Sequence, residues 1–321
     1  MNNKIILLIL GEPFSTFSEI IGKFFSKKKN YNSTIVIIGN INLLKSQLKK
    51  LKLKFSLKEI IKFEEAKKNK INILNINFNY KKIFSKISDK SSEYITNSFK
   101  KSLEILKIHN NKKIILINGP ISKKSFLKKK YLGITEYLSK KTNSSGEVML
   151  IYNEKFSVSP LTTHIPLKYV TKNITKKKIL NNVLKIDKFY SKILKKRAKF
   201  AILGLNPHCE TTDRFSEEEK IIIPSIRTLK KKGLNIDGPF SADTFFLSKN
   251  LDKYNVVIGM YHDQVLTPIK TLFNFRAINI TIGLPFIRIS PDHGPNYEML
   301  GKNNSDPSSF KYAMRFIQNL K

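Results

Sequence analysis

The sequence predicts an α/β protein with a largely parallel sheet, because short apolar runs alternate along the chain with longer amphipathic segments. Eight runs are rich in Ile, Leu and Val and have the length of a buried strand. They are "IILLIL" (5–10), "TIVIIGN" (34–40), "INILNINF" (71–78), "KIILING" (113–119), "VMLIY" (148–152), "FAILGLN" (200–206), "NVVIGMY" (255–261) and "AINITIG" (277–283).

Three segments between these runs carry helical periodicity. Segment 91–109 has one apolar stripe and begins with "SSE", a capping pattern, and segment 179–194 repeats apolar residues at helical spacing. Segment 216–232 begins with three glutamates and ends with three lysines, the charges that favour the two ends of a helix. Because no Pro/Gly/Ser linker occurs, the domain boundary is only approximate. We expect two lobes, divided near residue 120, with the chain returning late to the first.

The charge balance is strongly basic, with 59 Lys and Arg against 24 Asp and Glu, a formal net charge of +35. Residues 237–321 hold 9 Lys/Arg and 7 Asp/Glu, a net of +2, so the other +33 lies in residues 1–236. There it is spread over many short lysine runs and does not form one stripe with stacking aromatics. We therefore interpret it as solvated surface and expect no nucleic-acid partner.

The chain has one cysteine, Cys209, which excludes an internal disulfide and a thiolate zinc cage and suits a reducing cytosol. The longest apolar run near the N-terminus, residues 5–10, is far too short to span a bilayer and lacks a cleavage-site pattern. We expect a cytoplasmic protein with no membrane partner.

Three histidines follow strand-like runs, at the sheet edge where ligands of open α/β proteins bind. They are His164 in "PLTTHIPL", His208 in "LGLNPHCE" and His262 in "GMYHDQ". Three histidines without a thiolate would suit a catalytic divalent metal with an open position for substrate. Any one of them alone favours a structural or surface histidine, and three at strand ends in separate βα units make convergence on one site an even alternative. His109 is expected to cap a helix, and His293 to lie in a turn.

Lys270, Asn279 and Arg288 follow His262, each in or beside a strand-like stretch. A cation buried near a sheet needs a counter-charge, and this region has few acids, so a phosphate or carboxylate ligand is a reasonable partner. The alternative is that both cations are solvated in loops. Neither a G-x-G-x-x-G motif nor a Walker-type loop occurs. These residues alone indicate a metal-assisted enzyme that acts on a small anionic substrate.

The ordered motifs "TTHIPL", "LNPH", "GPFSADT", "YHDQ", "NITIGLPFIR" and "DHG" resemble those of the 4-hydroxythreonine-4-phosphate dehydrogenase (PdxA) family. Nearer the N-terminus, "GEP", "NGPISK" and "GITEYL" fall at landmarks of the same family. The resemblance spans nearly the whole chain and is strongest from His164 to Gly294.

The resemblance implies a fold like that of isocitrate and isopropylmalate dehydrogenases, with two lobes around a largely parallel sheet. It implies a homodimer whose active sites lie in the inter-lobe cleft at the subunit interface. The implied cofactors are NAD or NADP, bound without a Rossmann fingerprint, and a divalent Zn, Mg or Co ion. The implied reaction, in pyridoxal 5'-phosphate biosynthesis, oxidises 4-phosphooxy-L-threonine and decarboxylates it to 3-amino-2-oxopropyl phosphate.

The resemblance also implies roles for individual residues. The metal ligands, to which both subunits contribute, would be His164, His208 and His262. The substrate-binding residues would be Thr135, Lys270, Asn279 and Arg288. Asp243 and Lys270 are the catalytic candidates.

The sequence departs from the family pattern at four places. Ile134 stands where "GHTE" usually has His, and Val265 stands where a Gly usually follows "YHDQ". "FSTFSE" after "GEP" and "CETTDR" after "NPH" replace glycine-rich stretches. Because Ile134 cannot donate a hydrogen bond, it favours an alternative substrate, a threonate or erythronate phosphate. A catalytically silent relative, or a protein that binds acidic polymers, is the third possibility.

Overall fold

The computed structural model describes residues 4–27, 32–110, 113–122, 126, 131, 133–210, 212–274, 276–291 and 294–320. The chain divides into two compact units. Unit 1 comprises Met1–Leu138 and Pro285–Asn319, and unit 2 comprises Ser139–Leu284 with Leu320–Lys321. The sequence suggested a boundary near residue 120; the division falls after Leu138, and the chain re-enters unit 1 at Pro285.

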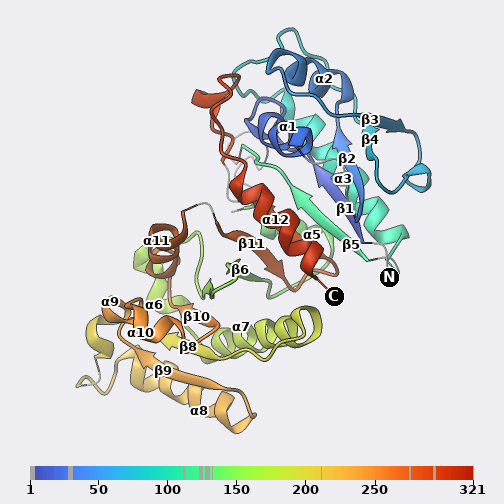
Figure 1. The fold of residues 1–321 in the computed structure, drawn as a ribbon. Helices are drawn as coiled ribbons and strands as arrows, with labels where there is room; N and C mark the ends of the chain where they lie inside the picture. The colour runs from blue at the N-terminus through green and yellow to red at the C-terminus, as the bar shows by residue number, and fades with distance from the viewer. Residues whose placement is uncertain are drawn as a thin grey trace. The chain divides into compact units, whose positions relative to one another are not determined.

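The sheet of unit 1 is parallel throughout, in the order β3-β4-β2-β1-β5-β12; Figure 1 labels the first five of these strands. Its last strand comes from the C-terminal part of the chain and pairs with β5, which places Arg288 opposite Leu116. The strands are β1 (Ile5–Ile9), β2 (Thr34–Gly39), β3 (Leu57–Ile60), β4 (Ile71–Asn75), β5 (Ile114–Asn118) and β12 (Ile287–Pro291).

The helices of unit 1 include two from opposite ends of the chain that pack together through aromatic rings. Phe310 of α12 makes edge contacts with Phe17 and Phe25 of α1, with ring centroids 5.7 and 5.9 Å away. The prediction that the "SSE" pattern caps α3 is wrong, because no side chain among the described residues caps the N-terminus of this helix. The Ser91 hydroxyl instead donates to Glu12 Oε2 (3.0 Å) and to Ser88 O (2.8 Å). The helices are α1 (Phe17–Lys27), α2 (Ile41–Lys50), η1 (Phe63–Glu65), α3 (Ser91–Ile108), α5 (Ile134–Lys141), η6 (Tyr297–Met299) and α12 (Ser308–Asn319).

The sheet of unit 2 has the order β11-β6-β7-β10-β8-β9. Strand β6 runs antiparallel to both of its neighbours, while β7, β10, β8 and β9 are parallel to one another. The strands are β6 (Val148–Tyr152), β7 (Ser157–Pro160), β8 (Phe200–Leu203), β9 (Ile236–Phe240), β10 (Val256–Gly259) and β11 (Ile278–Ile282).

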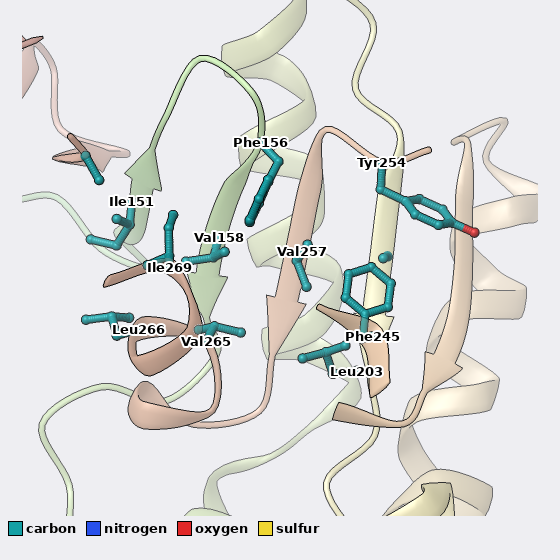
Figure 2. Packing of buried hydrophobic residues seen from close by; sticks show 12 residues of the cluster. Ile151, Phe156, Val158, Leu203, Phe245, Tyr254, Val257, Val265, Leu266 and Ile269 are labelled. Carbon is teal, nitrogen blue, oxygen red and sulfur yellow. The ribbon is translucent and has the colours of Figure 1, made fainter. Parts of the chain in front are cut away.

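Helix α11 covers part of this sheet. Figure 2 shows Val265, Leu266 and Ile269 of α11 in one buried cluster with Val158 of β7 and Val257 of β10. The sequence did not predict this helix, whose interior contains Pro268. The helices of unit 2 are η2 (Leu167–Tyr169), α6 (Val170–Asn173), α7 (Lys176–Phe189), η3 (Tyr190–Leu194), η4 (Pro207–Cys209), η5 (Glu218–Ile222), α8 (Ile223–Lys231), α9 (Ala242–Phe245), α10 (Ser248–Leu251) and α11 (His262–Phe273).

The predicted fold class is confirmed, because both units are built from largely parallel sheets with helical connections. Each of the eight predicted runs contains a strand, and β3, β7, β9 and β12 were not predicted. Among the described residues, every helix is too short or too polar to cross a lipid bilayer.

Candidate active site

The three histidines singled out by the sequence follow three neighbouring strands of unit 2. His164 follows β7, His262 follows β10, and His208 follows β8, and these parallel strands are adjacent in the order β7-β10-β8. The carboxyl ends of neighbouring parallel strands meet at one edge of a sheet, where open α/β proteins bind ligands. The strand order therefore brings the three histidine-bearing segments to the same edge.

His262 and His164 form a pair. His262 is the first residue of α11, and its ring centroid lies 5.8 Å from that of His164. Its Nδ1 lies 2.6 Å from Oδ1 of Asp263, the distance of a strong hydrogen bond. A neutral ring that donates from Nδ1 to this carboxylate has its lone pair on Nε2, as a metal-binding imidazole requires.

His208 lies beside Asp243, one of the two catalytic candidates. The distance from His208 Nδ1 to Asp243 Oδ2 is 3.9 Å, which allows electrostatic attraction but not a hydrogen bond. A 2.6 Å hydrogen bond from Ser241 Oγ holds the pKa of Asp243 below its ordinary value. Asp243 is thus a carboxylate at neutral pH, and both side chains are exposed at the surface of unit 2.

The donor set fits a divalent cation in kind, because imidazole nitrogens and a carboxylate are ordinary ligands of Zn and related metals. Among the residues that the structure describes, no three His, Cys, Asp or Glu side chains lie close enough together to hold a metal ion. The described residues of one chain therefore provide a pair of histidines and a histidine–aspartate pair, but not a complete three-ligand centre.

Arg288 is a buried cation of unit 1, so the alternative that it is a solvated loop residue is wrong. It is 2% exposed, its Nε donates to Asn118 Oδ1 (2.8 Å), and its Nη1 donates to Thr135 Oγ1 (3.4 Å). Burial lowers the pKa of Arg288 to about 10, against the opposing effect of the Glu136 carboxylate. The guanidinium therefore stays charged at neutral pH, beside a second predicted substrate residue.

Lys270 and Asn279 lie on different elements of unit 2. Lys270 is exposed on α11, two turns after His262, and so lies in a helix that the sequence did not indicate. Asn279 lies on β11, where its Oδ1 is buried and has no hydrogen-bond partner among the described residues. A buried amide oxygen without a partner is rare in proteins and is a candidate for ligand contact.

The departures from the family pattern have different structural consequences. Val265 lies within α11 and is fully buried, so it occupies a position that needs no glycine. Cys209 has a φ of 57°, so a residue with a side chain adopts the left-handed conformation where the family pattern predicts glycine. Residues 12–19, all described, contain no positive φ angle. Ile134, the first residue of α5, is half-buried.

Sequence reasoning missed Asn118, which the motif "NGPISK" contains but does not single out. Asn118 is the last residue of β5, is 2% exposed, and orients Arg288 through its side-chain oxygen. A polar residue that ends an otherwise apolar strand is the signal that could have found it. His109 caps α3 as predicted, and His293 lies outside the described residues.

Comparisons with known proteins cover almost the whole chain. The family model of the pyridoxal phosphate biosynthetic protein PdxA matches residues 31–317. The 4-hydroxythreonine-4-phosphate dehydrogenase of Sulfurihydrogenibium sp. is 36% identical over 312 residues, 95% of this chain and 94% of that protein. A D-threonate 4-phosphate dehydrogenase of Pectobacterium atrosepticum is 34% identical over 191 residues, 59% of each chain.

Solved structures agree with these similarities. The crystal structure of 4-hydroxythreonine-4-phosphate dehydrogenase from Klebsiella pneumoniae has a TM-score of 0.83 and 25% identity, covering 98% of this chain and 99% of that chain. Isocitrate dehydrogenase from Methylococcus capsulatus, at 9% identity and a TM-score of 0.50 over 99% of this chain and 84% of that chain, shares the fold alone. The chain therefore belongs to the PdxA family of pyridoxal phosphate biosynthetic proteins, with the isocitrate-dehydrogenase-like fold that the motifs implied.

Proposed function

We propose that this protein is a cytoplasmic, homodimeric 4-hydroxythreonine-4-phosphate dehydrogenase of pyridoxal 5'-phosphate biosynthesis. It oxidises 4-phosphooxy-L-threonine with NAD or NADP, and the product loses CO₂ to give 3-amino-2-oxopropyl phosphate. The observation that carries the proposal is the buried guanidinium of Arg288, which Asn118 holds beside Thr135. The chain is also similar along almost its whole length to dehydrogenases of this name.

The substrate is a phosphorylated hydroxy amino acid, and its anionic groups need fixed positive charges. Arg288 provides a planar guanidinium suited to bidentate contact with phosphate or carboxylate, and Lys270 provides a compact ammonium charge. Thr135 and Asn279 add a hydroxyl and an amide oxygen, the latter buried without a partner among the described residues. Holding the anion at several points orients the reacting carbon toward the cofactor.

The residues that would hold a divalent cation are His164, His208 and His262. A bound Zn, Mg or Co ion would supply Lewis-acid chemistry, lowering the pKa of the substrate hydroxyl and stabilising negative charge on its oxygen. The hydrogen bond to Asp263 keeps His262 in the tautomer that such a site needs. The described residues of one chain bring no three such ligands together, and the arrangement that we propose is a homodimer in which both subunits contribute ligands.

Two side chains are available to hold or move a proton. The Asp243 carboxylate attracts the nearby His208 ring and can accept a hydrogen bond. The Lys270 ammonium can donate a proton to the carbon that CO₂ leaves. Both roles are part of the proposal.

The test is NADH production by the full-length protein with 4-phosphooxy-L-threonine, before and after treatment with a chelator. We expect turnover that the chelator abolishes and that Zn²⁺, Mg²⁺ or Co²⁺ restores. A protein that turns over no member of a panel of phosphorylated hydroxy acids with any of these metals would overturn the proposed function.

A second candidate function is favoured by Ile134, which cannot make the hydrogen bond of the usual histidine, and by the partial similarity to a D-threonate 4-phosphate dehydrogenase. Under this alternative the substrate is a threonate or erythronate phosphate. The same panel discriminates between the two candidates, because the physiological substrate should have the higher kcat/KM. Faster turnover of D-threonate 4-phosphate than of 4-phosphooxy-L-threonine would replace the first proposal with the second.

A further inference from the structure

Gln264 connects two of the histidine-bearing segments of unit 2. It is a buried residue in the first turn of α11, and its Oε1 accepts a hydrogen bond from the backbone N of Met260 (2.7 Å). Its Nε2 donates to the backbone O of Gly204 (2.8 Å). Met260 comes two residues before His262, and Gly204 comes four residues before His208. One side chain therefore ties together the segments that leave β10 and β8.

Glu218 holds the second of these segments. It begins η5, is completely buried, and accepts hydrogen bonds at Oε1 from the backbone N of Leu205 (2.7 Å) and of Asn206 (2.9 Å). Its Oε2 accepts from Asn206 Nδ2 (2.7 Å). A buried carboxylate is costly unless such charge-assisted bonds compensate it. The two residues that it holds are the last before Pro207 and His208.

Thr162 joins the third histidine segment to the same strand end. Its hydroxyl donates to Met260 O (2.7 Å), and its backbone N donates to the same oxygen (3.2 Å). Thr162 comes two residues before His164. The backbone of Met260 thus bonds to Gln264 through its N–H and to Thr162 through its oxygen.

Two glycines leave the space that these contacts need. A Cβ on Gly204 would lie 3.0 Å from Glu218 Oε1 and 2.7 Å from Cys209 Sγ. A Cβ on Gly259 would lie 3.0 Å from Gln264 Oε1. The strand ends are therefore packed closely around both buried polar side chains.

We propose that Glu218 and Gln264 are positioning residues of the histidine site. The hydrogen bonds of Glu218 and Gln264 go to residues before the histidines and not to the histidine side chains. They fix the backbone segments that carry His208 and His262. The proposal rests on the proposed function, in that it takes these histidines as metal ligands. Glu218 would then have a role beyond that predicted from the sequence, in which the three glutamates only favour the start of a helix.

The test is the affinity of the metal-free full-length protein for Co²⁺ alone, measured by titration of the visible absorption of the bound ion. We expect Gln264→Leu and Glu218→Gln each to weaken Co²⁺ binding about 10- to 100-fold, the usual effect of losing a residue that supports metal ligands. Glu219→Gln is the matched control, because Glu219 is the exposed neighbour of Glu218. It should bind Co²⁺ as the wild type does.

A second control separates positioning from loss of stability. Ile269→Val removes a buried methyl group from the same helix without touching the hydrogen bonds, so it should lower the unfolding temperature and leave Co²⁺ affinity unchanged. Wild-type affinity in Gln264→Leu and Glu218→Gln would overturn the positioning roles. Equal loss of Co²⁺ affinity in Ile269→Val would also overturn them.

Co²⁺ binding by the wild type and by His262→Ala distinguishes failure of the proposed function from failure of this inference. If the wild type binds Co²⁺ and His262→Ala does not, the histidine site stands, and only the positioning variants are in question. If the wild type and His262→Ala bind Co²⁺ equally weakly, the metal site of the proposed function falls.

Hydrogen exchange in the wild-type protein provides a test that needs no variant. The amides of Met260, Leu205 and Asn206 donate to Gln264 and Glu218, so they should exchange slowly with solvent deuterium. Exchange at the rate of exposed loop amides would overturn the inference, even if the variants do not fold.

Discussion

Replacing Glu12 with Gln should remove a pH dependence of stability that the buried Glu12 carboxyl imposes on unit 1. The side chain is 1% exposed, and its Oε2 accepts a hydrogen bond from Ser91 Oγ (3.0 Å). Its Oε1 is buried and finds no hydrogen-bond partner among the described residues. Burial raises the pKa of Glu12 from 4.5 to about 7, although the bond from Ser91 opposes that rise.

The sign of the effect follows from proton binding. Because the pKa of Glu12 is higher in the folded than in the unfolded chain, the folded chain binds more protons between pH 4.5 and about 7. The free energy of unfolding therefore falls as the pH rises through this window. A shift from 4.5 to about 7 corresponds to roughly 3 kcal/mol, at about 1.4 kcal/mol for each pH unit.

The assay is urea unfolding followed by circular dichroism at a series of pH values across this window. The stability of Glu12→Gln relative to the wild type should increase by up to about 3 kcal/mol from the acid to the alkaline side. Glu104→Gln, at an exposed position of α3, should follow the wild type at every pH. Ser91→Ala should move the transition to higher pH, because it removes a bond that lowers the pKa of Glu12. Parallel curves for Glu12→Gln and the wild type would refute the reasoning.

Three further predictions concern packing and the substrate site. Asn118→Ala should lower the free energy of unfolding by about 2 kcal/mol, because it leaves a buried guanidinium N–H without its acceptor. In an Arg288→Met background, urea unfolding should show that Asn118→Ala lowers the free energy of unfolding much less. An equal decrease in the two backgrounds would contradict the hydrogen bond between Arg288 and Asn118. Gly259→Ala should cost about 1–3 kcal/mol, since its Cβ would lie 2.5 Å from Val265 Cγ1, and the loss should shrink in a Val265→Ala background. Ile134→His should raise kcat/KM for 4-phosphooxy-L-threonine about tenfold by restoring a hydrogen bond; a fall would count against this substrate.

Hydrophobic periodicity predicted the strands that form continuous apolar runs and missed β3, β7, β9 and β12, in which polar residues, Gly or Pro interrupt the apolar pattern. Strand β7, "SVSP", is fully buried, yet Ser157 hydrogen-bonds to Tyr190 Oη (2.9 Å) and Ser159 donates to Met149 O (2.7 Å). These partners lie 33 and 10 residues away along the chain and on other elements, so the pattern of the strand itself does not reveal them. Strand β9 contains a Gly-Pro pair, which normally indicates a turn.

The candidate site could also be predicted only in part, because local patterns in the sequence reveal strand ends but not contacts between strands. His208 and His262 follow runs that were recognisable as strands, so their location at strand ends was accessible from the sequence, whereas His164 follows β7, which the sequence did not predict. The roles of Asn118 and Gln264 depend on strands that become neighbours only in the fold, β5 with β12 and β10 with β8. Burial of Arg288 likewise depends on pairing of β12 with β5, which the sequence alone does not indicate.

The late arrival of β12 has a consequence for synthesis of the chain on the ribosome. Unit 2 is almost continuous in sequence and can close as soon as it has emerged, whereas β5 of unit 1 waits for residues 287–291. Until then β5, all of whose residues are buried in the finished protein, presents an open apolar edge. A chain interrupted before residue 287 would leave this edge of β5 unpaired and open to pairing with other chains, so protection of the edge depends on synthesis of residues 287–291.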